Sequence, residues 1–155
     1  FKKHYDIAHE ISNHLSELSA LENLGATYTQ MGDYYKAVDA YEQAATISQE
    51  IGNREAELMH IRRIGEAYAM IGNLDVIPNA IEVNERQLAL SREIKDSDAE
   101  AAALAMLGFL NYNIGEKEKG IMLTKQALEI FRAIGAPAST VDALRNMLRQ
   151  WGVSN

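Results

Sequence analysis

Cysteine is absent from this chain of 155 residues, and only two prolines occur in it. Without thiols the protein forms no disulfide and offers no thiolate to a metal, which is typical of an intracellular, cytoplasmic protein. The scarcity of proline, together with only ten glycines, argues against a disordered or collagen-like chain. No apolar run approaches the ~20 residues that a helix needs to cross a bilayer, so we expect no membrane insertion.

Positive charge is also in short supply. Lysine and arginine number 15 against 22 acidic residues, and the formal net charge is −7. A protein that binds duplex nucleic acid needs a basic face to displace counterions from the phosphates, so we predict no direct nucleic-acid partner. The chain opens on Phe1 without an initiator methionine or a signal-peptide pattern, and we interpret it as a piece of a longer protein.

What the sequence does contain is one pattern that occurs three times. Apolar residues three and four positions apart flank a glycine, a spacing that predicts one apolar stripe along an amphipathic helix. The copies are Leu21-x-x-Leu24-Gly25-x-x-Tyr28, Ile61-x-x-Ile64-Gly65-x-x-Tyr68 and Leu104-x-x-Leu107-Gly108-x-x-Asn111. A second glycine follows each first one by seven residues, at Gly32, Gly72 and Gly115.

This pattern resembles the tetratricopeptide repeat (TPR), in which Leu-Gly and Tyr are followed by Ala and an aromatic residue. The glycines at 25, 65 and 108 are 40 and 43 residues apart, more than the usual ~34. The resemblance is therefore to the long variety, found in LGN-type G-protein signalling modulators and in kinesin light chain. It implies an all-α fold, a right-handed superhelical solenoid of antiparallel helix pairs with about seven or eight helices.

The same periodicity divides the chain, which we expect to be a single TPR domain over residues 1–155. Residues 1–12 are predicted to be the second helix of a truncated repeat, three repeats follow, and a capping helix covers the last apolar face. The repeats are 14–53, 54–96 and 97–136, and the capping helix is 137–151. The predicted helices are 1–12, 14–31, 34–51, 54–71, 77–94, 97–114, 117–134 and 137–151.

Two sets of glycines have different expected roles. Those inside helices, such as Gly25 and Gly108, each cost about 1 kcal/mol relative to alanine, which implies a close approach of the paired helix at Ala37 or Ala80. Those at helix ends, such as Gly32, are expected to adopt a left-handed conformation. Ser97 and Glu100 could form a capping box for the helix that follows.

The sequence offers little to catalysis. The first three of its four histidines are five residues apart, whereas two metal ligands on one helix face are usually four apart. No Ser/His/Asp or Cys/His arrangement can be assembled with any specificity, and the glycines form no phosphate-binding loop. We therefore predict no enzyme, no catalytic residue, no cofactor and no metal.

The expected binding surface is the inner, concave wall that the first helix of each repeat lines. Adjacent arginines can hold a carboxylate bidentately, and exposed aromatic side chains are typical binding anchors. The candidate partner-binding residues are Asn23, Arg62, Arg63, Glu66, Met106, Phe109 and Tyr112. The alternative is that Arg62 or Arg63 is paired with neighbouring acids and that Phe109 packs against the next repeat.

The leading hypothesis for function is a protein–protein interaction scaffold or adaptor. It would bind an acidic, partly apolar peptide or helix in the concave groove. The alternative is a regulatory or sensor repeat arm of a larger signalling or transcription-control protein. A third hypothesis is self-association through exposed solenoid ends.

Overall fold

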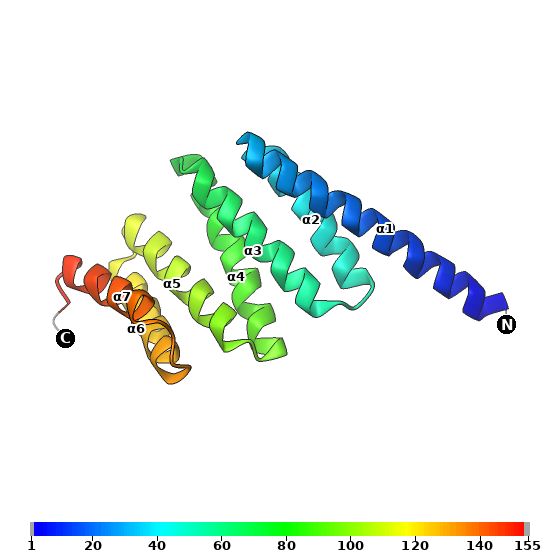
Figure 1. The fold of residues 1–155 in the computed structure, drawn as a ribbon. Helices are drawn as coiled ribbons and strands as arrows, with labels where there is room; N and C mark the ends of the chain where they lie inside the picture. The colour runs from blue at the N-terminus through cyan, green and yellow to red at the C-terminus, as the bar shows by residue number, and fades with distance from the viewer. Residues whose placement is uncertain (1, 154–155) are drawn as a thin grey trace. The chain divides into compact units, whose positions relative to one another are not determined.

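The computed structural model describes the backbone of residues 2–153 and the side chains of residues 13–153. Within the described residues every regular element is helical, which confirms the predicted all-α class. The elements are α1 Lys2–Met31, α2 Tyr34–Glu50, α3 Arg54–Ile71, the 3-10 turn η1 Leu74–Val76, α4 Ile77–Ile94, α5 Ser97–Asn113, α6 Lys117–Ala133 and α7 Ala138–Gln150 (Figure 1). None of these helices is long and apolar enough to cross a membrane.

The chain divides into two compact units, Phe1–Val76 and Ile77–Asn155. In the first unit α2 packs against both α1 and α3. In the second, α5 packs against both α4 and α6, and α7 packs against α6. Short loops between long helices make neighbours in sequence antiparallel neighbours in space. The boundary between the units falls inside residues 54–96, the second predicted repeat, and the predicted repeat bounds stay a prediction.

Each unit has an apolar core made from the predicted helix stripes. In the first unit the core cluster joins α1 to α2 and consists of Leu18, Leu21, Ala44 and Ile47. In the second unit it joins α5, α6 and α7 and consists of Ala101, Leu104, Ala127, Leu128, Phe131, Val141, Leu144 and Leu148. The helix predicted to cap the stack therefore buries its apolar side against α6.

Most helix boundaries lie within one residue of their predicted positions, but one predicted break is wrong. The separate helices predicted at 1–12 and 14–31 are one continuous helix, α1. Between every other pair of successive long helices lies a residue with positive φ, such as Gly32 or Gly52. Residues 11–14 contain neither glycine nor proline, so nothing in them ends a helix. The side chains of residues 1–12, on which their assignment to a truncated repeat depends, lie outside the described ones.

Aspartate and asparagine side chains start three of the helices. Asp33, Asn53 and Asp96 accept hydrogen bonds from backbone N–H groups in the first turns of α2, α3 and α5. At the first of these ends the ammonium of Lys36 lies 2.7 Å from the Asp33 carboxylate. Their hydrogen bond lowers the pKa of Asp33 and raises the pKa of Lys36.

The capping box predicted from Ser97 and Glu100 does not form. The cap is Asp96, one residue earlier, whose carboxylate accepts a 2.9 Å hydrogen bond from the N–H of Ala99. Aspartate caps a helix as well as serine does, so Ser97 is the first residue of the helix and not its cap. Glu100 instead accepts a 2.7 Å hydrogen bond from Arg92 of α4.

Candidate functional site

The outward side of α3 is the most exposed of the predicted binding faces. Six residues are exposed on it between positions 59 and 70, and we call them the α3 face: Met59, Arg62, Arg63, Glu66, Ala69 and Met70. The Nη1 atom of Arg63 lies 3.0 Å from Oε2 of Glu66, and both side chains are about half exposed. Arg62 has no ion-pair partner among residues 13–153. The sequence left two alternatives for these arginines, which are binding to a partner or pairing with a neighbouring acid. Pairing with a neighbouring acid is what the structure shows for Arg63.

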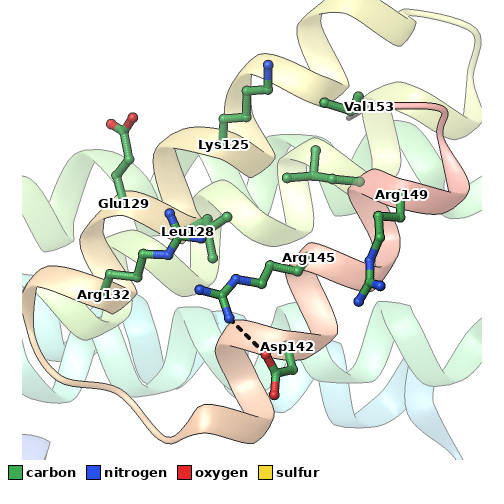
Figure 2. Close-up of a pocket in the computed structure, with 9 residues that line it drawn as sticks. Lys125, Leu128, Glu129, Arg132, Asp142, Arg145, Arg149 and Val153 are labelled. Atoms are coloured by element: carbon green, nitrogen blue, oxygen red, sulfur yellow. Dashed lines mark hydrogen bonds and ion pairs between the residues drawn. The ribbon is translucent and has the colours of Figure 1, made fainter. Parts of the chain in front are cut away.

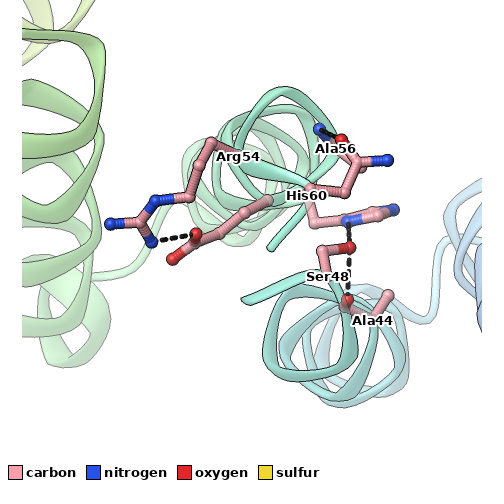
Figure 3. Close-up of polar contacts among 7 residues, drawn as sticks. Ala44, Ser48, Arg54, Ala56 and His60 are labelled. Atoms are coloured by element: carbon pink, nitrogen blue, oxygen red, sulfur yellow. Dashed lines mark hydrogen bonds and ion pairs between the residues drawn. The ribbon is translucent and has the colours of Figure 1, made fainter. Parts of the chain in front are cut away.

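Next to the α3 face lies a polar cluster that ties three helices together. His60 of α3 is fully buried. Its Nε2 atom lies 2.9 Å from Oε1 of Glu22 in α1, and its Nδ1 atom lies 3.2 Å from Oγ of Ser48 in α2. Figure 3 shows the contact between His60 and Ser48, and the 2.8 Å contact from Ser48 to the carbonyl oxygen of Ala44. Every polar atom of the imidazole is therefore used.

The hydrogen-bond roles in this cluster follow from the donors that it holds. An ionised carboxylate can only accept hydrogen bonds. The Nε2–H group of His60 is therefore the donor in its hydrogen bond with Glu22. When the imidazole is neutral, the Ser48 hydroxyl donates to Nδ1. When the imidazole is charged, Ser48 accepts from Nδ1–H and donates to the Ala44 carbonyl.

The order carboxylate–histidine–serine is also that of a hydrolase triad, an arrangement that could not be assembled from the sequence alone. The Ser48 side chain, however, is fully buried, so no substrate can reach its hydroxyl. The cluster therefore acts by fixing α1, α2 and α3 relative to one another.

In the second unit, the structure separates the two predicted aromatic anchors on α5. Phe109 is 43% exposed, whereas Tyr112 and Met106 are partly buried. The Tyr112 ring stacks on Trp151, with ring centroids 4.0 Å apart and planes 6° apart. Tyr112 therefore has one ring face covered, and Phe109 is the exposed aromatic residue of this face.

The remaining predicted residue, Asn23, is exposed on α1, where its backbone carbonyl accepts a hydrogen bond from Thr27. Of the seven predicted residues, the structure brings Arg63 and Glu66 into direct contact. Among residues 13–153 no group of three His, Cys, Asp or Glu side chains is arranged to hold a metal ion.

Antiparallel helices with a repeated glycine pattern and exposed first-helix faces define an α-helical repeat protein. The tetratricopeptide-repeat family model matches residues 1–50 and, in a second register, residues 16–77. The two matches together cover residues 1–77, and this part of the chain belongs to the tetratricopeptide-repeat family. A search of curated protein sequences finds no match to it.

Several solved structures share the fold. The TPR domain of Arabidopsis FLU is 18% identical with a TM-score of 0.67, covering 77% of this chain and 98% of that one. The apo form of RapI is 16% identical with a TM-score of 0.71, covering 87% of this chain and 50% of that one. A Podosopora anserina putative kinesin light chain with TPR-like repeats is 20% identical with a TM-score of 0.66, covering 88% of this chain and 65% of that one. This chain thus spans about half of RapI and about two thirds of the kinesin light chain protein, and identities this low indicate the fold alone.

Proposed function

We propose that this TPR protein binds an acidic, partly apolar peptide or helix of a partner protein through the exposed faces of its first helices. The TPR fold supports a role in protein–protein interaction, and the α3 face supports the chemistry of the partner. The observation that carries the proposal is Arg62, an exposed guanidinium that has no ion-pair partner within the described part of the chain, on a face that also exposes methionine.

Arg62 and Arg63 would supply the recognition of carboxylates. A guanidinium can bind a carboxylate bidentately, in a geometry that lysine cannot reproduce. The pair between Arg63 and Glu66 is exposed, and exposed pairs contribute only about 0–1 kcal/mol. A partner carboxylate can therefore displace Glu66 at little cost and bind both arginines.

Methionine and phenylalanine would supply the apolar contacts. Met59 and Met70 flank the arginines on the α3 face and are 42% and 62% exposed. Methionine adapts to irregular surfaces because its side chain is unbranched and flexible. In the second unit, Phe109 offers an exposed ring beside Met106. Asn23, Glu66 and Tyr112 are proposed to contact the partner at the edges of these faces, and the concave groove stays a prediction.

The test begins with capture of a partner by the immobilised chain and its identification by mass spectrometry. The double variant Arg62→Glu/Arg63→Glu should capture at least tenfold less of that partner than the parent does. Lys95→Glu/Lys119→Glu, which makes the same charge change at two exposed positions outside the α3 face, should capture far more of the partner than the double arginine variant does. Equal capture by all three proteins would contradict the role assigned to the α3 face.

A regulatory or sensor arm, self-association and a cytoplasmic place of action stay predictions from the sequence. Among them, self-association has the simplest test, because the mass measured by light scattering would rise with protein concentration.

A further inference from the structure

A cleft of about 600 Å³ lies between α6 and α7 in the second unit, on residues that no part of the proposed function uses. We call it the α6–α7 cleft. Its charged lining consists of Lys125, Arg132, Arg145 and Arg149 with Glu129 and Asp142. The cleft therefore carries a net charge of +2 in a chain whose net charge is −7. Figure 2 shows Arg132 of α6 and Arg145 of α7 extending toward one another across it.

The internal repeat shows how the lining of the cleft differs from the equivalent positions one repeat earlier. A shift of 40 residues places α4 on α6 and α5 on α7, so that Leu88 corresponds to Leu128 and Gly108 to Leu148. The positions equivalent to the lining carry one acid and one base, Glu85 and Arg92. The net positive charge is therefore particular to the α6–α7 pair.

The basic side chains of the cleft are available to a ligand. Arg132 and Lys125 are exposed and have no ion-pair partner among residues 13–153. Arg145 pairs with Asp142 at 3.1 Å on its own helix, and that pair is exposed enough to be exchanged at little cost. At the base of the cleft Leu128 and Leu148 are almost fully buried, and Val153 adds partly exposed apolar surface.

We propose that the α6–α7 cleft is a second binding site, which takes an extended acidic segment of a partner protein. Carboxylates of the segment would pair with Arg132 and Arg145, and an apolar residue of the segment would contact Val153. Charge complementarity selects this occupant. Glu129 and Asp142 in the lining disfavour the continuous row of phosphates of a nucleic acid, whereas separate carboxylates can avoid them.

The experiment selects heptapeptides from a displayed random library on the intact chain. Peptides that depend on the cleft should be rich in aspartate and glutamate and should also carry an apolar residue. Calorimetry on the synthetic peptides should show at least tenfold weaker binding to Arg132→Glu/Arg145→Glu. Binding should be unchanged in Arg62→Glu/Arg63→Glu, so this site and the α3 face can fail separately. Lys119→Glu, on α6 outside the lining, is the charge-matched control.

Several results would overturn the proposal. Selected peptides that are not acidic, or that bind the Arg132→Glu/Arg145→Glu variant as tightly as the parent, would exclude an acidic segment as the occupant. A concentration-dependent mass in sedimentation that this variant abolishes would assign the cleft to a second copy of the chain. Because both arginines are exposed or partly exposed, the variant should keep the parent's circular dichroism signal; Arg132→Gln/Arg145→Gln repeats the test without added negative charge.

Discussion

At the scale of single residues, His60 connects three helices through polar contacts. It is fully buried in α3 and bonds to Glu22 of α1 and Ser48 of α2. Truncation to alanine leaves a cavity and removes the partner of a buried hydroxyl. We expect His60→Ala to cost about 2–4 kcal/mol in the free energy of unfolding. Urea denaturation measures it.

His14, a partly exposed residue of α1, provides the control for this prediction. His14→Ala should change the stability by less than about 0.5 kcal/mol, as surface substitutions usually do. Ser48→Ala should cost about 1 kcal/mol, since the imidazole then loses its contact at Nδ1 and keeps the one at Nε2. If His60→Ala unfolded at the same urea concentration as His14→Ala, the assigned role of the cluster would be wrong.

Lys95 is the one non-glycine residue with positive φ among the described residues, at φ 61° between α4 and α5. Four other junctions between helices have an isoleucine followed by a glycine with positive φ: Ile51-Gly52, Ile71-Gly72, Ile114-Gly115 and Ile134-Gly135. The junction between α4 and α5 has Ile94-Lys95 instead. A left-handed conformation costs a residue with a side chain about 1–2 kcal/mol. Glycine avoids this cost, but it also raises the conformational entropy of the unfolded chain, which offsets part of the gain. Lys95→Gly should therefore stabilise the protein by about 0.5–1 kcal/mol in thermal unfolding.

The matched control has the opposite sign. Lys119 is exposed inside helix α6, where glycine costs about 1 kcal/mol relative to a helix-favouring residue. Lys119→Gly should therefore lower the melting temperature while Lys95→Gly raises it. A fall in both variants would contradict the strain assigned to Lys95.

Some of these residue roles are readable in the sequence and others are not. Gly32 and Gly72 could be predicted as left-handed helix ends because they recur at a fixed distance from the repeat pattern. The contact between Glu22 and His60 spans 38 residues and occurs once, so no periodicity indicates it. The stacking of Tyr112 on Trp151 likewise depends on where two helices end up in space.

At the scale of helices, the packing of α5 on α6 depends on two glycines that face each other. A Cβ atom on Gly108 would lie 2.2 Å from Oγ1 of Thr124 and 3.0 Å from the carbonyl oxygen of Gly120. At Gly108 the close approach is thus to Thr124 and Gly120, and Gly120 is the counterpart of Ala37. Around Gly25 the predicted neighbour was Ala37, but the nearest atoms belong to the ring of Tyr41, the counterpart of Thr124.

The sign of a glycine-to-alanine change tests this close packing. Inside a helix without neighbours, alanine would stabilise by about 1 kcal/mol. Gly108→Ala should instead destabilise by about 1–3 kcal/mol, since the added methyl meets backbone atoms that cannot move aside. Chemical denaturation measures the effect of Gly108→Ala on the free energy of unfolding, once in the parent and once in a Thr124→Ala background. The loss of stability should be smaller in the Thr124→Ala background. If Gly108→Ala stabilised the parent, the close packing would be contradicted.

Helix α7 covers the apolar end of the second unit, with Val141, Leu144 and Leu148 buried in the core cluster. Deleting residues 137–155 should uncover Leu128 and Phe131 of α6 and lead to aggregation or dye binding to the exposed apolar surface. Leu144→Ala, a milder change, should cost about 2–5 kcal/mol. Exposed Ser139 provides the control, because Ser139→Ala removes no buried contact. A soluble deletion variant as stable as the parent would show that α7 is not needed as a cover.

The helices themselves were largely predictable, because glycine and polar caps recur at each end. The predicted break at residue 13 was wrong because it was inferred by extending the repeat beyond its clear copies, without a local stop signal in residues 11–14. The α6–α7 cleft could not be predicted for the opposite reason. Each of its basic residues is ordinary by itself, and only the packing of α7 on α6 places them around one space.

At the scale of the whole molecule, the net charge of −7 opposes an acidic partner. The proposed function therefore requires that local arginines outweigh a long-range repulsion. Arg62→Glu and Lys119→Glu each lower the net charge by two, from −7 to −9, but only the first changes the α3 face. Comparing them separates the contact from the overall field.

We expect Arg62→Glu to weaken binding of the captured partner by tenfold or more, which is a loss of about 1.4 kcal/mol. Lys119→Glu should weaken it far less, and its effect should disappear at high salt, where the charges of the molecule as a whole are screened. Phe109→Ala should also weaken binding, but without changing the salt dependence, because its contribution is the burial of apolar surface. Calorimetry at low and high salt distinguishes the three variants. If Arg62→Glu and Lys119→Glu weakened binding equally, net charge alone would account for the effect, and the α3 face would not be the contact surface.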